Sequence, residues 1–266
     1  MKFTRFLIVP LTCLCFSAFG QITDNFSDGD FTQNPSWQGD VANFVVNTDG
    51  ELQLMAPAAG SSTLAVSGNI PDSAIWNLHF RLTFAPSSGN LLRIYLLADQ
   101  ASLTTANGYF LEIGENGSLD ALRFFRQDGA AKTLLATGQA GLVATDPTDI
   151  HLGVKRSKAG TWTIEAGAGS DALQLQNIVL DATYGGGPNR FFGIYTLYTA
   201  TRTDNFFFDD LSILPDVPDV QPPVLTGVLA ESASAIKVTF NENLDATVAN
   251  NPGNYNISNG IGQPTT

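Results

Sequence analysis

Hydrophobic and polar residues alternate with a period of two along much of the middle of this chain. Within Trp76–Phe84 the even-numbered positions are apolar, and the odd-numbered ones, which include His79, are polar. The same alternation runs through Ile150–Val154 and Trp162–Ile164. Because successive side chains of a strand point to opposite faces of a sheet, the pattern predicts strands with one buried and one solvent-facing side.

Shorter apolar or alternating segments predict further strands, separated by turn signals such as Thr48–Gly50 and Gly185–Pro188. No long amphipathic helical pattern interrupts the series, so the sequence predicts an all-β protein built as an antiparallel jelly-roll sandwich. The further predicted strands are Asn43–Asn47, Glu51–Met55, Ser62–Val66, Leu91–Ala98, Gly108–Ile113, Leu122–Arg126, Lys132–Ala136, Leu173–Val179, Arg190–Tyr198 and Asn205–Ile213.

Residues 1–20 have the pattern of a secretory signal peptide. Lys2 and Arg5 precede an apolar run, and Ala18 and Gly20 stand at the −3 and −1 positions of a cleavage site. The apolar run is too short to cross a bilayer as a helix, and no later stretch approaches 18 apolar residues. We therefore expect an exported protein without a membrane span, located outside the cell or on a bacterial cell surface.

The two cysteines of the chain, Cys13 and Cys15, both lie inside this leader. A lipid anchor on one of them is the alternative to cleavage, but neither follows a convincing small-residue lipobox. The exported part then has no cysteine, which excludes disulfides, a thiol nucleophile and a cysteine-based zinc site. Its stability must rest on an apolar core.

The rest of the sequence divides into a domain at 21–214, a linker at 215–223 and a second segment at 224–266. Four prolines between Leu214 and Pro223 predict a stiff, extended linker. Beyond it, Ile236–Phe240 starts a new alternating pattern. An immunoglobulin-like sandwich needs about 100 residues, so we expect a partial, truncated Ig-like domain and a chain that is a fragment of a larger multidomain protein.

The chain carries 25 acidic and 13 basic residues, for a formal net charge of −12. Such a surface repels nucleic acid and anionic membranes, so no nucleic-acid partner is expected. It is compatible with divalent cations, although an acidic surface without any ligand explains the same composition.

The tetrapeptide Thr23–Phe26 recurs as Thr203–Phe206, and further acidic residues follow each copy. The first and last strands of a sandwich often lie side by side, and Ca²⁺ takes six to eight oxygen ligands. The repeat thus predicts a structural calcium site formed by Asp24, Asp28, Asp30, Asp209 and Asp210. Alternatively, the first acids form Asx-turns and the last ones cap or protect an edge strand.

Aromatic residues are candidates for stacking on sugar rings. Trp37 lies in a loop-like context, and Tyr195 and Tyr198 lie near a strand end, so these three are the predicted ligand-binding residues. Packing in the core is the alternative, and it is the expected role of Trp76 and Trp162.

The sequence predicts no catalytic residues. His79 and His151 fall at polar positions of alternating strands, where exposed sheet-face residues are expected. No Gly-x-Ser-x-Gly nucleophile motif is present. Glu112 and Glu115 are three residues apart and face opposite sides of a strand, unlike the paired acids of a glycosidase. A carbohydrate-active, glycoside hydrolase-like enzyme stays the alternative, and it would need two convergent carboxylates in a cleft.

Four segments carry a resemblance to a known family: Asp24–Asp40, Gly50–Leu54, Arg126–Gly129 and Asp204–Asp210. They resemble secreted, Bacteroidetes-type surface proteins of the lamin-tail-domain or gliding-motility-associated family. The resemblance implies an N-terminal jelly roll of the concanavalin or laminin-G type. The segment from Pro222 to Ile257 is similar to bacterial Ig-like surface repeats. We therefore expect a non-enzymatic module that binds a glycan or cell-surface polymer, or that serves as a spacer, with calcium as a stabilising ion.

Overall fold

The computed structural model describes residues 22–217, 222–242, 244, 246–258 and 262–264. The chain forms two compact units, which divide between Val217 and Pro218. The predicted signal peptide at 1–20 and part of the predicted linker lie outside the described residues.

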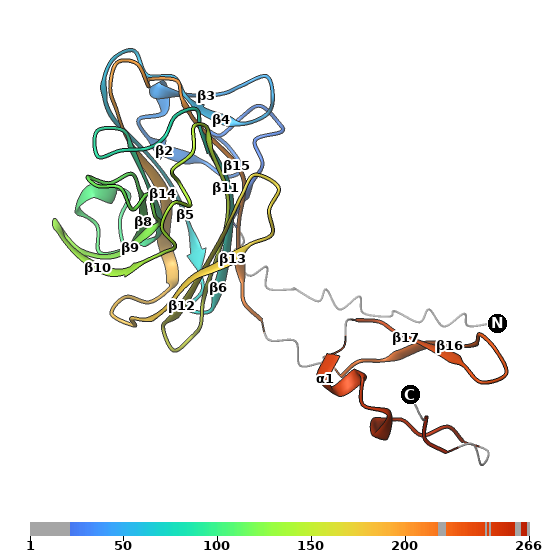
Figure 1. Ribbon diagram of the computed structural model, residues 1–266. Helices are drawn as coiled ribbons and strands as arrows, with labels where there is room; N and C mark the ends of the chain where they lie inside the picture. The colour runs from blue at the N-terminus through green and yellow to red at the C-terminus, as the bar shows by residue number, and fades with distance from the viewer. Residues whose placement is uncertain (1–21, 218–221, 243, 245, 259–261, 265–266) are drawn as a thin grey trace, which may run out of the picture. The chain divides into compact units, whose positions relative to one another are not determined.

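The first unit is an antiparallel jelly-roll sandwich of two sheets that lie face to face (Figure 1). The eight-stranded sheet has the order β13-β12-β11-β6-β15-β4-β3, and β1 pairs with β15. Its strands are β1 (Ile22–Asp24), β3 (Phe44–Val46), β4 (Leu52–Leu54), β6 (Ala74–Leu82), β11 (Thr148–Arg156), β12 (Thr161–Ala168), β13 (Gln174–Leu180) and β15 (Phe206–Pro215).

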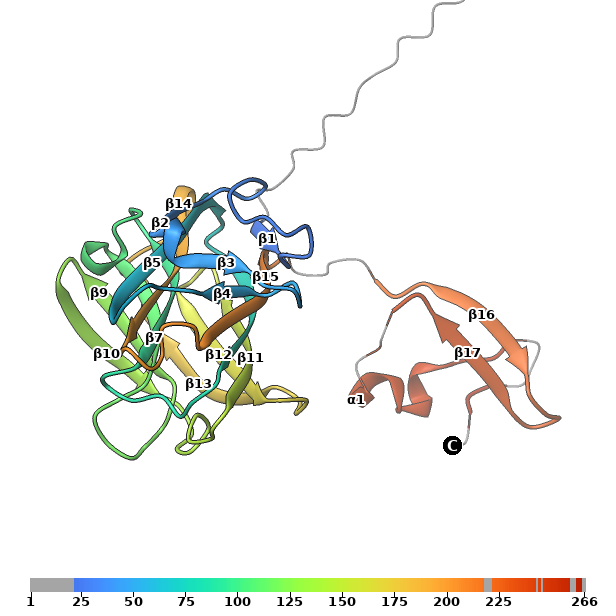
Figure 2. The same ribbon diagram turned by 90° about the horizontal axis from the view of Figure 1, so that it is seen from above.

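The seven-stranded sheet has the order β10-β9-β8-β7-β14-β5-β2. Figure 2, which shows the first unit from above, shows this sheet facing the eight-stranded one. Short 3₁₀ turns interrupt the loops at Val41–Asn43 and Leu103–Thr105. The strands are β2 (Trp37–Gly39), β5 (Gly60–Ile70), β7 (Leu91–Ala98), β8 (Gly108–Ile113), β9 (Arg123–Asp128), β10 (Ala131–Thr137) and β14 (Gly187–Tyr198).

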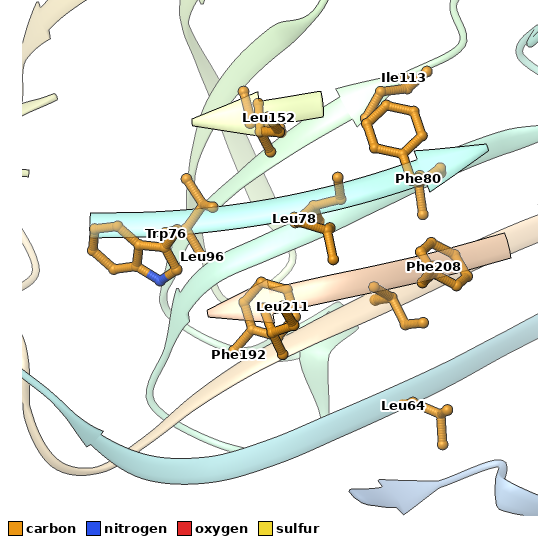
Figure 3. Close-up of a cluster of buried hydrophobic side chains, with 14 of the residues drawn as sticks. Leu64, Trp76, Leu78, Phe80, Leu96, Ile113, Leu152, Phe192, Phe208 and Leu211 are labelled. Carbon is orange, nitrogen blue, oxygen red and sulfur yellow. The ribbon is translucent and has the colours of Figure 1, made fainter. Parts of the chain in front are cut away.

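The core lies between the sheets and follows from the period-two pattern. Along β6 every second residue is buried, from Ala74 to Leu82, and the intervening ones face outward. Figure 3 shows Trp76 and Phe80 of β6 among apolar side chains from both sheets. Trp76 stacks on Trp162 of β12 at 5.5 Å between ring centroids. Full burial of each large apolar side chain contributes about 1.5–3 kcal/mol, which lets the domain hold together without disulfides.

The first and last strands of this unit are neighbours, as the repeated tetrapeptide predicted. Thr23 of β1 pairs with Ser212 of β15, and Asp24 pairs with Leu211. The two copies of the repeat therefore lie at the start and near the end of one folded unit.

The second unit begins with a hairpin of β16 (Leu225–Ala230) and β17 (Ile236–Phe240). A short helix α1 (Ala246–Ala249) and a 3₁₀ turn at Pro252–Asn254 follow. The hairpin strands match the alternating pattern of the sequence, whereas the Ig-like assignment stays a prediction. Among the described residues of both units, no helix is long and apolar enough to cross a membrane.

Candidate functional site

Three adjacent strands, β11, β6 and β15, place a row of polar side chains on the outer face of the eight-stranded sheet. His79 on β6 is the direct cross-strand partner of His151 on β11 and of Asp209 on β15. These residues lie on the solvent-facing side of their strands, as the alternating pattern predicted, since their neighbours Leu78, Phe80 and Leu152 are buried. The register between the three strands places these side chains side by side, and the sequence of one strand does not show this register.

The two imidazole rings of this row stack on each other. The centroids of His79 and His151 are 4.3 Å apart, and the ring planes differ by 8°. Asp149, two residues before His151, approaches with its Oδ1 atom 2.8 Å from Nε2 of His79. The sequence predicted outward positions for both histidines. The structure adds that His79 is half-buried while His151 is exposed.

The imidazole pair borders a hollow of about 430 Å³. The sheet lines it with Asn77 and the two histidines, and the loop 169–173 between β12 and β13 lines it as well. Asp210 of β15 also belongs to the lining. The lining residues are Asn77, Leu78, His79, His151, Leu152, Gly169, Ser170, Asp171, Ala172, Leu173 and Asp210.

Two glycines allow this loop to fold back over the sheet. A Cβ atom on Gly153 would lie 2.8 Å from Cδ1 of Leu173, and one on Gly167 would lie 2.5 Å from the carbonyl oxygen of Asp171. Real Cβ contacts are not this short, so a larger residue at Gly153 would displace the Leu173 side chain, and one at Gly167 would push the loop backbone outward. The amide of Gly169 also donates to the Asp149 carbonyl at 2.9 Å, which ties the loop to β11.

A β-bulge in β15 brings Asp210 to the rim. The register of β15 against β6 shifts between Asp209 and Ser212, and Asp210 adopts a left-handed φ of 52°. Its amide donates to Oδ1 of Asp209 at 2.7 Å. Partial burial raises the pKa of Asp209, the charge of Asp210 adds to this rise, and the amide of Asp210 and the nearby His79 act against it. Two acidic residues, Asp171 and Asp210, thus line the hollow beside the two imidazoles.

Of the acids predicted to bind calcium, Asp24 is buried, and its oxygens accept hydrogen bonds from the Phe26 amide at 3.0 Å and from Trp37 Nε1 at 2.8 Å. Burial raises the pKa of Asp24, and the charges of Asp28 and Asp209 add to this rise. Within the described residues, just one group of three potential metal ligands lies within 4.8 Å, and that group is His79, Asp149 and His151.

Asp24, Asn25 and Asp28 form the Asx-turns that the sequence offered as the alternative, and Asp30 forms a further one. Asp28 accepts a hydrogen bond from the Asp30 amide at 3.0 Å, and Asp30 accepts from both the hydroxyl and the amide of Thr32 at 2.7 Å. The bonds from Thr32 lower the pKa of Asp30. These carboxylates serve local turn geometry, whereas Asp209 and Asp210 belong to the row beside the hollow.

The three aromatic residues predicted to bind a ligand also lie apart. Trp37 and Tyr198 are each 4% exposed, so neither offers a ring face at the surface. Tyr198 Oη lies 2.6 Å from Oγ of Ser62 inside the sandwich. Tyr195 is half-buried on the outer face of the other sheet, where the guanidinium of Arg93 lies 5.0 Å from its ring centroid.

The sequence matches no protein-family model and no curated protein. Its fold does match solved structures. The exoplasmic/lumenal domain of VIP36, bound to Ca²⁺ and Man3GlcNAc, is 12% identical with a TM-score of 0.54, and the match covers 76% of this chain and 90% of that one. The potassium-bound carbohydrate recognition domain of Emp46p is 11% identical with a TM-score of 0.53, covering 74% and 97%.

A legume lectin-like domain from Entamoeba histolytica is 12% identical with a TM-score of 0.53, and the match covers 72% of this chain and 96% of that one. At these identities the likeness establishes the fold. The first unit is a concanavalin-like jelly-roll sandwich of the kind found in legume-type lectins.

Proposed function

We propose that the first unit is a non-enzymatic carbohydrate-binding module of an exported or cell-surface protein. The observation that carries the proposal is the hollow on the outer face of the eight-stranded sheet. Its volume of about 430 Å³ falls in the range of small-ligand sites, roughly 300–1,000 Å³. The solved structures with the same fold, named above, include carbohydrate recognition domains, which supports a sugar as the ligand.

The lining suits a sugar ring. Leu173 is 41% exposed and presents an apolar surface at the wall. Asn77 and Asp210 supply an amide and a carboxylate, which hydrogen-bond hydroxyl groups as donor and acceptor. A pyranose has an apolar face and a rim of hydroxyls, so it meets both kinds of surface here. A purely structural spacer would not need such a hollow.

The test is a glycan array probed with the purified chain, followed by titration of the glycans that bind. Leu173→Ala should weaken binding by about tenfold, equivalent to about 1.4 kcal/mol. The matched control is Leu180→Ala, because Leu180 is exposed at the far end of β13, the strand that follows the loop, and does not line the hollow. Binding to no glycan, or equal loss in both variants, would contradict the proposal.

The enzyme alternative is tested in the same experiment. Any glycan that binds is incubated with the chain, and its length is followed by mass spectrometry. Hydrolysis that disappears in Asp210→Asn would favour a glycosidase that uses the acids around the hollow. An unchanged glycan supports the binding module.

We also propose that the module belongs to a secreted, Bacteroidetes-type surface protein and that it sits in a larger multidomain chain. The support is the leader-like pattern at 1–20 and the proline-rich segment before the second unit. Expression with residues 1–20 fused to a reporter tests the export. A reporter retained in the cytoplasm would contradict it.

Calcium is a separate question. The structures of related fold include Ca²⁺-bound and potassium-bound domains. Asp24, Asp28 and Asp30 accept hydrogen bonds from the chain, and the charges of Asp28 and Asp209 act on Asp24. A structural calcium ion at the five predicted acids stays a prediction.

A further inference from the structure

We propose that His79, His151 and Asp149 form a binding site for a transition-metal ion such as Zn²⁺ on the outer face of the eight-stranded sheet. One ligand atom from each residue lies within 4.8 Å of the other two. The set offers two imidazole nitrogens and one carboxylate oxygen. Imidazole suits zinc, copper and nickel, whereas calcium and magnesium prefer oxygen ligands.

The sheet holds the ligands in place before any metal arrives. His79 and His151 are direct cross-strand partners, and Asp149 follows the same face of β11 two residues away. All three backbones lie in the paired region of β6 and β11, so binding costs little backbone ordering. The buried neighbours Leu78, Phe80 and Leu152 fix the direction in which these side chains leave the sheet.

The distances come close to shared coordination. His79 Nε2 and Asp149 Oδ1 are joined by a hydrogen bond of 2.8 Å. Two zinc–ligand bonds of about 2.0–2.2 Å at a tetrahedral angle separate their donor atoms by about 3.3–3.6 Å. A zinc ion would therefore replace the proton of this hydrogen bond, and the two donor atoms would move apart by roughly half an ångström. His151 is exposed, so its ring can turn by the small amount that brings its nitrogen to the same spacing.

The surroundings favour a cation and leave room for it. Asp209 is the cross-strand partner of His79 on the other side, and Asp210 follows in the bulge. Their negative charge, with that of Asp149, attracts a divalent ion. The hollow opens beside both imidazoles, which leaves space for water or another ligand to complete the coordination.

The experiment uses the full chain with an affinity tag that contains no histidine, stripped of metal with a chelator. Zn²⁺ is then titrated calorimetrically without any glycan, so the outcome is independent of the carbohydrate proposal. We expect one Zn²⁺ per chain and a rise in melting temperature on binding. Binding should weaken by about 100-fold or more in His151→Ala and in Asp149→Asn.

Glu165→Gln is the matched control, because Glu165 is a carboxylate on the next strand, β12, at a half-buried position. It should bind Zn²⁺ like the unaltered chain. His151 is exposed, so His151→Ala is expected to fold, and circular dichroism verifies this. Electron paramagnetic resonance of bound Cu²⁺ should show coupling to two imidazole nitrogens, and to one in His151→Ala.

Three results would overturn the proposal. The first is the absence of Zn²⁺ binding to the unaltered chain. The second is Zn²⁺ binding that persists unchanged in a folded His151→Ala variant, which would place the ion elsewhere. The third is bound Cu²⁺ without nitrogen coupling, which would show that carboxylates alone hold the ion and that the His79–Asp149 pair is a simple salt bridge.

Discussion

The indole Nε1 of Trp37 donates a hydrogen bond of 2.8 Å to the buried carboxylate of Asp24. Trp37 opens β2 in the seven-stranded sheet, and Asp24 ends β1 at the edge of the other sheet. The bond therefore links the two layers of the sandwich. Asp24 was predicted to bind calcium and Trp37 to bind a sugar, and in the structure the two side chains are hydrogen-bonded to each other.

Asp24→Ala should lower the free energy of unfolding by about 1–3 kcal/mol, because it leaves the buried indole N–H without its partner. Trp37→Phe should show a similar or larger loss. Urea denaturation of both variants and of the double variant measures the coupling. Asp28→Ala, in an exposed turn, is the control and should cost less. Strict additivity of the two changes would contradict a direct bond.

A second carboxylate, the half-buried Asp181, predicts the acid sensitivity of the domain. It follows β13 in one sheet and accepts hydrogen bonds of 2.7 Å from Tyr109 and Arg126 of the other sheet. Partial burial alone would raise its pKa, but the bonds from Tyr109, Thr183 and Arg126 outweigh this and lower the pKa to about 2.

A carboxylate whose folded-state pKa is depressed stabilises the fold above its unfolded pKa of about 3.9, and the contribution disappears as the pH falls toward about 2. Asp181→Asn should therefore cost stability near neutral pH and much less near pH 2. Unfolding free energies of both proteins across this range measure the difference. A difference independent of pH would contradict the assignment. Asp49→Asn, on an exposed turn, is the control.

Gly167→Ala should displace the loop that forms one wall of the hollow. The new methyl group would meet the carbonyl of Asp171, and overpacking of this kind costs about 1–3 kcal/mol. Hydrogen exchange should become faster at the amides of Gly169 and Asp171, which donate to the carbonyls of Asp149 and Ala168. Gly89→Ala, where a methyl group meets nothing within 4 Å, should leave the exchange unchanged.

Adding Ca²⁺ to the metal-free chain distinguishes the two roles of the five acids: the melting temperature should stay unchanged if Asp24, Asp28 and Asp30 serve only as hydrogen-bond acceptors, and should rise if they bind the ion. Asp24, Asp28 and Asp30 already accept hydrogen bonds from the chain. Differential scanning calorimetry with and without Ca²⁺ measures the effect. A clear rise in melting temperature would show that calcium binds, and its loss in Asp209→Asn would locate the ion at β15.

Much of the strand content could be predicted from local pattern. Leu91–Ala98 and Gly108–Ile113 coincide with β7 and β8, and the other predicted strands of the first unit overlap observed ones. The short strands β1 and β2 had no alternation long enough to detect. Their pairing with β15 and β5 depends on distant segments.

The candidate site was only half visible in the sequence. The alternation of apolar and polar residues along β6 and β11 already placed His79 and His151 at solvent-facing positions. Their meeting, and the approach of Asp149 from 70 residues away, required the register between the two strands. The hollow also depends on the packing of the loop 169–173 against Gly153 and Gly167. Such contacts between separate segments do not appear in the alternation of apolar and polar residues, so the sequence could not predict them.

The sequence by itself determined which side of each strand is buried, because that choice follows from the local alternation of apolar and polar residues. It also determined that no cysteine lies beyond Cys15, and that matching acidic segments follow the two copies of the repeated tetrapeptide. Only the tertiary structure decided which residues face each other. Cross-strand register and loop placement arise from packing between distant segments, and these joined Asp24 to Trp37 and His79 to His151.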